Sequence, residues 1–113
     1  MESLANLELS TEYPSGEEFA RHVGSVFRAL AEDGAGVELE LAEVEILPGQ
    51  RHGSGQDQAG SAFSLIFQGP ATAILRQRTY AMQHPGIGTL GIFIVPLGPH
   101  PQSKQMRYQA IFN

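Results

Sequence analysis

The chain of 113 residues contains no cysteine, and its second half contains no carboxylate. Without cysteine there can be no disulfide, thiolate zinc site, iron–sulfur cluster or cysteine nucleophile. All 12 acidic residues lie in residues 1–57 with only three of the seven cations, giving this half a formal charge of −9, whereas residues 58–113 carry the other four cations and a charge of +4. A general base, a carboxylate pair or a calcium site must therefore take its acids from the first half.

Long apolar runs and targeting signals are lacking as well. The first nine residues contain neither a basic region nor a long apolar run, so the sequence does not predict a signal peptide. The longest apolar stretch, Leu90–Leu97, is interrupted by Gly91 and Pro96 and is much shorter than the ~20 residues that a membrane helix needs. We therefore expect no membrane insertion and, by default, a cytoplasmic protein, although export by a dedicated system or release by cell lysis would leave no such signal.

Basic residues are few and scattered, so the sequence offers no continuous basic stripe for a phosphate backbone, and nucleic acid is not an expected partner. The charge difference between the halves has two explanations: the halves fold together with complementary surface charges, or the protein binds a charged partner. We favour the first. The length fits one domain over residues 1–113, which buries roughly two thirds of its unfolded surface around a single core.

A short helix is predicted for residues 15–23. Ser15 and Glu18 have the spacing of a capping box, in which each side chain binds a free backbone N–H at the start of the helix. The apolar spacing also fits a longer helix that continues to residue 31. We favour a strand over residues 25–31, because Asp33-Gly34 then forms a hairpin turn before the next strand.

The rest of the chain predicts strands. Val37, Leu39 and Leu41 alternate with polar residues, and the apolar positions then resume one residue out of phase, so we expect a β-bulge near Ala42-Glu43. Further strands are expected at about residues 63–68, 77–84, 90–97 and 108–112. About six strands at this spacing, with one short helix in front, predict a mainly β fold: a small antiparallel barrel or sandwich.

The strand at Leu90–Leu97 is apolar on both faces, as expected of a strand that is covered on both sides. The helix at residues 15–23 would supply one cover without any partner. The alternative is that this strand marks an association surface.

The segment Gly86–Gly91 matches the G-x-G-x-x-G pattern of dinucleotide-binding proteins. That motif works with a preceding strand, a following helix whose N-terminus faces the pyrophosphate, and an acidic residue about 20 positions later. Here a strand is predicted after the glycines, and no acid occurs downstream. We therefore interpret the segment as a tight glycine turn between two strands, and we expect no nucleotide or other cofactor.

Metal-dependent and hydrolytic sites have little support. Glu18 and His22 are four residues apart on the predicted helix and would supply half of a metal site, but no spacing provides a third ligand. A solvated Glu–His pair is the favoured interpretation. The sequence has no G-x-S-x-G elbow, and a Ser–His–acid triad has no local support. An enzyme is therefore the least supported class of function, and we expect no metal site.

Residues 48–61 are rich in glycine and glutamine and predict a mobile loop. A loop of this length is either functional or disordered, and we favour disorder. If it is functional, Arg51 and His52 are its candidate contacts with a ligand or a neighbouring subunit.

Most of the chain resembles a small, uncharacterised bacterial domain family. Its pattern contains F-x-L-x-F-x-G-P, a Q-x-x-Y-x-x-x-H strand, a glycine turn, an apolar strand that ends in proline, and a closing Y-x-A-x-F-N. The corresponding segments here are FSLIFQGP (63–70), LRQRTYAMQHPGIGTLGIFIVPLG (75–98) and RYQAIFN (107–113). This chain has Gln109 where the family commonly has a glutamate, which puts in doubt any shared site that uses that acid. The family carries no assigned catalytic motif, and its members resemble neighbours of phage-tail-collar-like proteins in bacterial gene clusters, which implies a structural or assembly role.

We therefore expect a non-enzymatic structural or assembly module. It would associate with itself or with a structural protein partner, in a phage-tail-like or surface appendage system, through strand edges and the face of Leu90–Leu97. The alternative is a small-molecule or carbohydrate-binding β-barrel whose site lies at one end of the sheet. The candidate contact residues for that end are Arg78, Tyr80, His84 and Tyr108, in addition to Arg51 and His52 of the loop.

Overall fold

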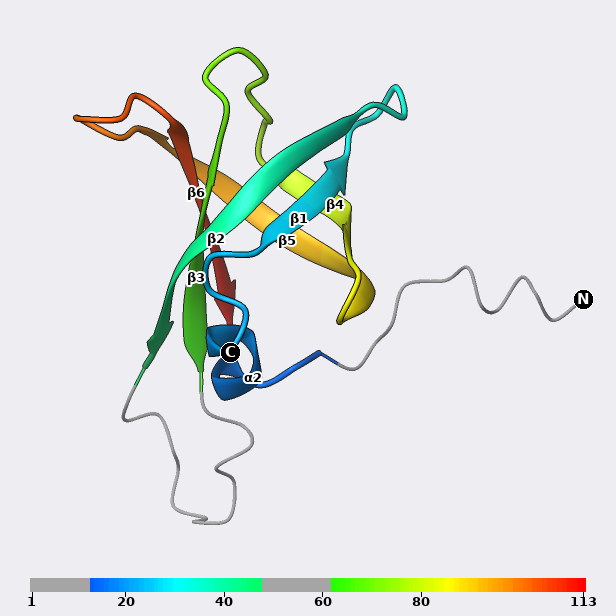
Figure 1. Cartoon of the computed structure of the whole chain (residues 1–113), viewed down its shortest axis with the longest axis vertical. Coiled ribbons are helices and arrows are strands. Elements are labelled where there is room, and N and C mark those ends of the chain that lie inside the picture. The colour runs from blue at the N-terminus through cyan, green and yellow to red at the C-terminus, as the bar shows by residue number, and fades with distance from the viewer. Residues whose placement is uncertain (1–12, 48–61) are drawn as a thin grey trace, which may run out of the picture.

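A computed structural model of the chain describes residues 13–47 and 62–113. Six antiparallel strands form a closed barrel in the order β1-β2-β3-β6-β5-β4, preceded by one short helix (Figure 1). The elements are α2 (Gly16–Ala20), β1 (Val26–Leu30), β2 (Gly36–Ile46), β3 (Phe63–Gly69), β4 (Arg78–His84), β5 (Gly88–Pro99) and β6 (Met106–Phe112). The predicted mainly β fold is confirmed, and of the two predicted architectures the structure is the barrel.

The capping box at the start of α2 is confirmed. The backbone N–H of Glu18 donates to Oγ of Ser15, and the backbone N–H of Ser15 donates to the Glu18 carboxylate, both over 3.1 Å. The helix ends at Ala20, so the prediction of a helix over residues 15–23 is too long. The chain turns instead, because Gly24 takes a positive φ of 94° and its N–H donates to the carbonyl of Leu41 on β2.

The strand that follows the helix is also confirmed, and the alternative of a helix to residue 31 is wrong. The β1–β2 turn contains Gly34 at φ 89°, and the Asp33 carboxylate accepts the N–H of Ala35. The expected β-bulge is present, because the register between β2 and β3 shifts between Leu41 and Glu43. The bulge brings Val44, after the shift, to the core that Leu39 and Leu41 occupy before it.

The core fills the barrel with side chains from every element. Phe19 of α2 is fully buried and closes one end of the barrel, with its ring 5.7 Å from that of Phe63 and 5.8 Å from that of Phe112. The largest fully buried side chains are Tyr108, Phe19, Phe27, Phe67, Leu39, Leu41, Leu65, Met82, Ile92 and Ile94.

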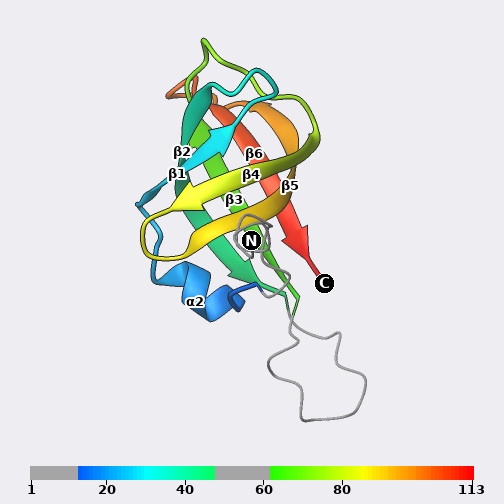
Figure 2. The ribbon, with the colours of Figure 1, turned by 90° about the vertical axis from the view of Figure 1, so that its right-hand side faces the viewer.

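The two ends of the barrel differ in what covers them. One end, which we call the loop end, carries the three connections at residues 31–35, 70–77 and 100–105. The other, which we call the helix end, carries α2 and the tight β4–β5 turn at residues 85–87 (Figure 2). Gly88, which directly follows that turn, has a φ of 103°, and the turn joins two paired strands, which confirms the interpretation of Gly86–Gly91 as a glycine turn.

The outer face of β5 is not covered as the sequence predicts. The side chain of Phe93 is 50% exposed, and the helix packs against β2 rather than over β5. The expectation that α2 covers Leu90–Leu97 is wrong, because a helix of five residues reaches only the end of the barrel. Within the described residues, no helix is long and apolar enough to span a membrane. The loop predicted at residues 48–61 lies outside the described residues.

Candidate functional site

The candidate contact residues do not gather at one end of the sheet. Arg78 begins β4 at the loop end, and His84 ends it at the helix end. A strand rises about 3.3 Å per residue, so the two positions are separated by roughly 20 Å. Tyr108 is fully buried and faces the core. The structure therefore does not bring these residues together in one site, and Arg51 and His52 lie outside the described residues.

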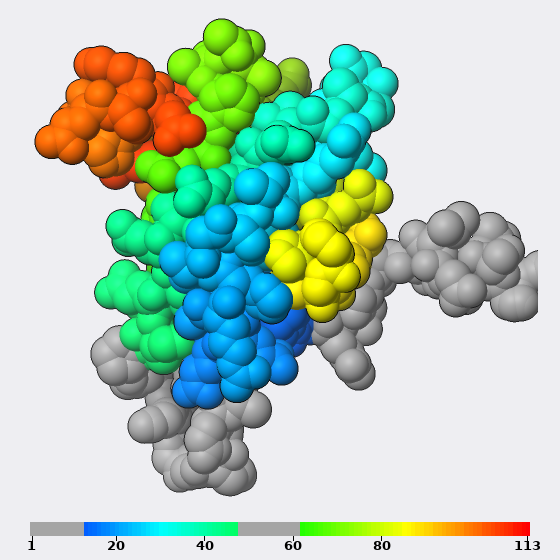
Figure 3. All heavy atoms as spheres, viewed as in Figure 1, coloured from blue at the N-terminus to red at the C-terminus, as the bar shows by residue number. Residues whose placement is uncertain are grey.

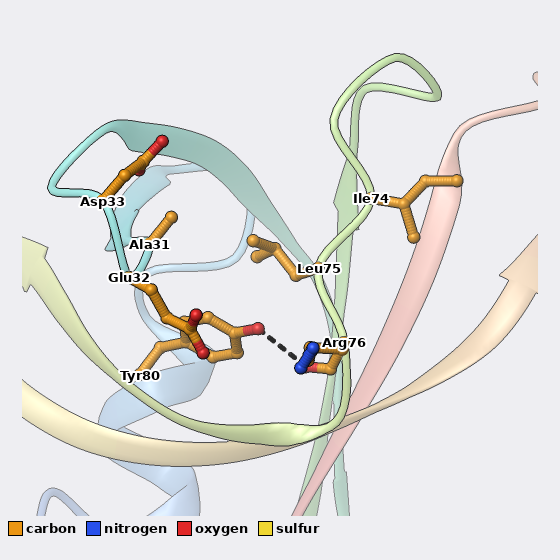
Figure 4. Close-up of a pocket in the computed structure, with 7 residues that line it drawn as sticks. All are labelled: Ala31, Glu32, Asp33, Ile74, Leu75, Arg76 and Tyr80. Carbon is orange, nitrogen blue, oxygen red and sulfur yellow. Dashed lines mark hydrogen bonds between the residues drawn. The ribbon is translucent and has the colours of Figure 1, made fainter.

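An open pocket of about 290 Å³ lies at the loop end (Figure 4). Its walls come from the β1–β2 turn, from the β3–β4 connection and from β4. The residues that line it are Ala31, Glu32, Asp33, Ile74, Leu75, Arg76 and Tyr80. Two carboxylates and one guanidinium thus surround a small opening next to apolar side chains, a composition suited to a polar solute of small size.

Tyr80 and Tyr108 hold the wall of this pocket rather than present their hydroxyl groups to its opening. The Tyr80 hydroxyl donates to the carbonyl of Arg76 over 2.8 Å, and the Tyr108 hydroxyl accepts the buried N–H of Leu75 over 3.0 Å. Burial raises the pKa of Tyr108; the Leu75 N–H opposes this effect, and Tyr80 adds to it. Both tyrosines therefore fix residues 75–76 over the end of the barrel.

Arg78 links the two halves of the sequence at the rim of the pocket. Its guanidinium forms an ion pair with Glu32 and lies 5.6 Å from the centre of the Tyr80 ring. Within residues 13–47 and 62–113 this is the one ion pair, and both partners are exposed enough to be well screened by solvent. It is an example of the expected charge complementarity between the halves.

A second group of polar side chains lies at the helix end, around the buried imidazole of His84. The N–H of Gly86 donates to Nδ1 of His84 over 2.9 Å, so Nδ1 is the unprotonated nitrogen of a neutral ring. Nε2 then carries the proton and donates to Oγ of Ser25 over 2.9 Å. The Ser25 hydroxyl in turn donates to the carbonyl of His22 over 2.6 Å. Figure 3 shows the β4–β5 turn against the residues that follow α2.

This arrangement is unsuited to nucleophilic chemistry. A serine nucleophile needs a histidine nitrogen that accepts the hydroxyl proton, whereas the nitrogen that faces Ser25 is a donor. The ring of His22 lies 4.8 Å from that of His84, but the described residues contain no group of three or more metal-binding side chains. Burial lowers the pKa of His84, and the nearby imidazole of His22 lowers it further. The group therefore fixes the residues that follow α2 to the β4–β5 turn.

Sequence reasoning missed this group, since nothing in the sequence joins residues 22–25 to residue 84. One feature of the sequence did indicate a buried histidine. The alternation in β4 places His84 on the same face as Tyr80 and Met82, and a histidine on a buried face needs partners for both ring nitrogens. The expected Glu18–His22 pair does not describe the contacts either, because Glu18 caps the helix and His22 packs against His84.

A third feature is the incomplete pairing of β5 with β6. Their ladder has four pairs, from Val95 with Gln109 to Pro99 with Met106, and it contains a bulge between Pro96 and Gly98. In the described part of the chain, Gly88–Ile94 of β5 pair only with β4, and Ala110–Phe112 of β6 pair only with β3. We call these two segments the β5–β6 seam. Figure 2 shows the strands separating toward the helix end.

Exposed apolar side chains flank the seam. Phe93 is 50% exposed on β5, and Ile111 is 55% exposed on β6. Both residues lie just beyond the last pair, Val95 with Gln109, on strands that no longer pair with each other there. The seam contains no charged residue.

Tyr13 bridges the two segments of the seam. Its ring packs edge-on against Phe112 of β6 at 5.4 Å, and its hydroxyl donates to the carbonyl of Gly91 on β5 over 2.9 Å. Because the ring lies on β6, the hydroxyl reaches Gly91 from the side of β5 that has no paired strand. One polar group of the open edge is thus already bound by a side chain.

The sequence also matches a known family along almost all of its described length. A family model described as Domain of unknown function (DUF6916) matches residues 14–112. The chain belongs to this family. The matched range of the DUF6916 domain contains α2, all six strands and both segments of the seam, and Tyr13 directly precedes it. The predicted resemblance to an uncharacterised domain family is confirmed. No curated protein and no solved structure matches the chain.

Proposed function

We propose that this DUF6916 domain is a non-enzymatic assembly module that associates, through the β5–β6 seam, with itself or with a structural protein partner. The observation that carries the proposal is the position of Phe93 and Ile111. These two half-exposed apolar side chains lie on the facing strands just beyond the point where the strand ladder stops. Single exposed apolar residues are ordinary, but an apolar pair on an open strand edge favours contact with another protein.

The composition of the seam supports the same proposal. Proteins commonly protect open strand edges with charged side chains, above all lysine, and this seam carries none. Pro96 and Pro99 lie in the part of β5 that pairs with β6, and each lacks the N–H that a ladder needs. Both prolines therefore weaken the short ladder that β5 forms with β6, and this ladder does not continue over Gly88–Ile94.

The setting that we propose is a phage-tail-like or surface appendage system. Its support is the resemblance of the family to neighbours of phage-tail-collar-like proteins. A small barrel with one open edge and a closed core fits such a role, because assembly needs a surface rather than a cavity.

The proposal is tested with Ile111→Lys, which places a charge on the seam at a side chain that is already 55% exposed. Val26→Lys is the matched control, because Val26 is 46% exposed on β1, on the opposite side of the barrel. Association of the protein with itself and with the products of neighbouring genes is measured by light scattering, and folding by circular dichroism. We expect Ile111→Lys to keep the fold and to lose association, and Val26→Lys to keep both. Unchanged association of the Ile111 variant would overturn the proposal.

The loop-end pocket supports a second candidate function, that of a small-molecule or carbohydrate-binding barrel. Glu32, Asp33 and Arg76 provide the hydrogen-bonding groups that hydroxyl-rich ligands use, beside the apolar side chain of Ile74. Thermal unfolding with a panel of neutral mono- and disaccharides tests it. A stabilisation that disappears in Arg76→Gln and persists in Ile111→Lys favours this candidate, and the absence of any stabilisation removes it.

A further inference from the structure

We infer that the partner at the β5–β6 seam is a second copy of this chain, whose β5 edge pairs antiparallel with the same edge of the first copy over Gly88–Ile94. In this arrangement Gly91 lies opposite Gly91 of the other copy, on a two-fold axis. The inference rests on the proposed function. It specifies which protein binds at the seam and in which strand register.

The distribution of charge selects this side of the barrel for association between identical chains. The outer face of β2 carries four exposed glutamates, Glu38, Glu40, Glu43 and Glu45. A two-fold interface that contains β2 would bring this row toward its own copy, and like charges in close contact are unfavourable. In the strand order of the barrel, β5 lies opposite β2. Pairing through β5 therefore joins two uncharged edges and keeps the acidic faces of the two copies apart.

The side chains of the β5 edge fit an antiparallel copy of themselves. Pairing about Gly91 places Phe93 of each copy opposite Thr89 of the other, so that a large side chain meets a small one. The same kind of neighbour already exists within one chain, where Phe93 pairs with Thr79 of β4. The two-fold axis itself falls on a residue without a side chain, so no bulky group meets its own copy there.

Tyr13 competes with this pairing. Its hydroxyl binds the carbonyl of Gly91, which an incoming strand would need for its own backbone N–H. Dimerisation must displace that hydroxyl, while the contact of the ring with Phe112 does not require it. Tyr13 thus weakens self-association without taking part in the core.

The first experiment compares the full-length wild type with Tyr13→Phe by sedimentation equilibrium. The substitution keeps the ring and removes the hydroxyl, so the dimer is expected to become tighter by roughly five-fold or more, the effect of one ordinary hydrogen bond. A dimer that is equally tight or weaker contradicts the role of Gly91 in the contact. If both proteins are monomers at every concentration, the inference is overturned. The proposed function then depends on a different protein partner, which the Ile111→Lys experiment tests.

The second experiment tests the register and uses the absence of cysteine from the chain. Thr89→Cys and Phe93→Cys proteins are mixed and oxidised gently. Paired residues have Cα atoms about 4.5–5.5 Å apart, within the range that a disulfide accepts. We expect the mixed disulfide to exceed both self-disulfides, and a mixture of Val26→Cys with Phe93→Cys to show no such excess. If the protein dimerises but the mixed disulfide is not favoured, the β5 pairing is wrong while the proposed function stands.

Discussion

The Nε2 atom of His84 lies 2.9 Å from the Oγ atom of Ser25, so the last residue of β4 is joined to the residue that precedes β1. The N–H of Gly86 donates a hydrogen bond to the other ring nitrogen, Nδ1. Every polar atom of this imidazole is therefore used, in a tautomer that exists only while the ring is neutral. The helix end of the barrel depends on that protonation state.

We predict that the free energy of unfolding falls when the pH drops below about 6.5. In the unfolded chain His84 takes up a proton near its ordinary pKa of 6.5, whereas burial and the neighbouring His22 lower that pKa in the folded protein. The unfolded state then binds more protons, so stability decreases as the pH falls and levels off below the folded pKa. Urea unfolding across this pH range measures the effect.

His84→Asn is expected to remove this His84-dependent slope, although the variant is less stable at neutral pH because Ser25 loses its donor. His100→Asn serves as the control, since that ring lies at the loop end, where its Nδ1 accepts the N–H of Gln102. A slope that survives in His84→Asn would show that other groups produce it.

Tyr108→Phe is expected to destabilise the protein by about 1–3 kcal/mol. The substitution removes the hydroxyl oxygen that accepts the buried N–H of Leu75. Tyr13→Phe removes a part-buried hydroxyl and is expected to cost less in the monomer. Chemical denaturation of both variants at low protein concentration gives the comparison. An equal cost for the two would argue against the role of Tyr108 in holding the β3–β4 connection.

Gly88→Ala is expected to cost about 1–2 kcal/mol, because the backbone there has a φ of 103° that a side chain disfavours. Gly86→Ala is the matched change in the same turn. Its φ is not positive, and an added Cβ would lie 3.4 Å from the nearest atom, Cε1 of His84, which is ordinary contact. Thermal or urea unfolding distinguishes them. A larger loss in the Gly86 variant would contradict the turn geometry.

Local features of the fold were predictable because short-range chemistry determines them. The Ser15–Glu18 capping box and the bulge near Ala42-Glu43 both follow from spacings of a few residues. The end of α2 was predicted too late in the chain. The chain turns at Gly24, whose N–H donates to the carbonyl of Leu41 on another strand. Apolar spacing alone does not reveal that contact.

The candidate sites depend on contacts between distant residues, so the sequence predicted them less well. Arg78 and His84 share a face of β4 but lie at opposite ends of it, and the expectation of one site used the shared face without the separation that six residues of strand impose. The apolar run at Leu90–Leu97 did indicate a strand with apolar side chains on its outer face. Whether that strand has a free edge depends on where the β5–β6 pairing stops, and the sequence does not determine this by itself.

Whether the seam is the association surface is decided by the molecular mass of Phe93→Lys in solution, compared with the wild type and with Val26→Lys over a wide range of concentration. Both valine and phenylalanine side chains are about half exposed, at 46% and 50%, so neither change disrupts the core. We expect the wild type and Val26→Lys to associate with increasing concentration and Phe93→Lys to remain a monomer. Association of Phe93→Lys equal to that of the wild type would contradict this expectation.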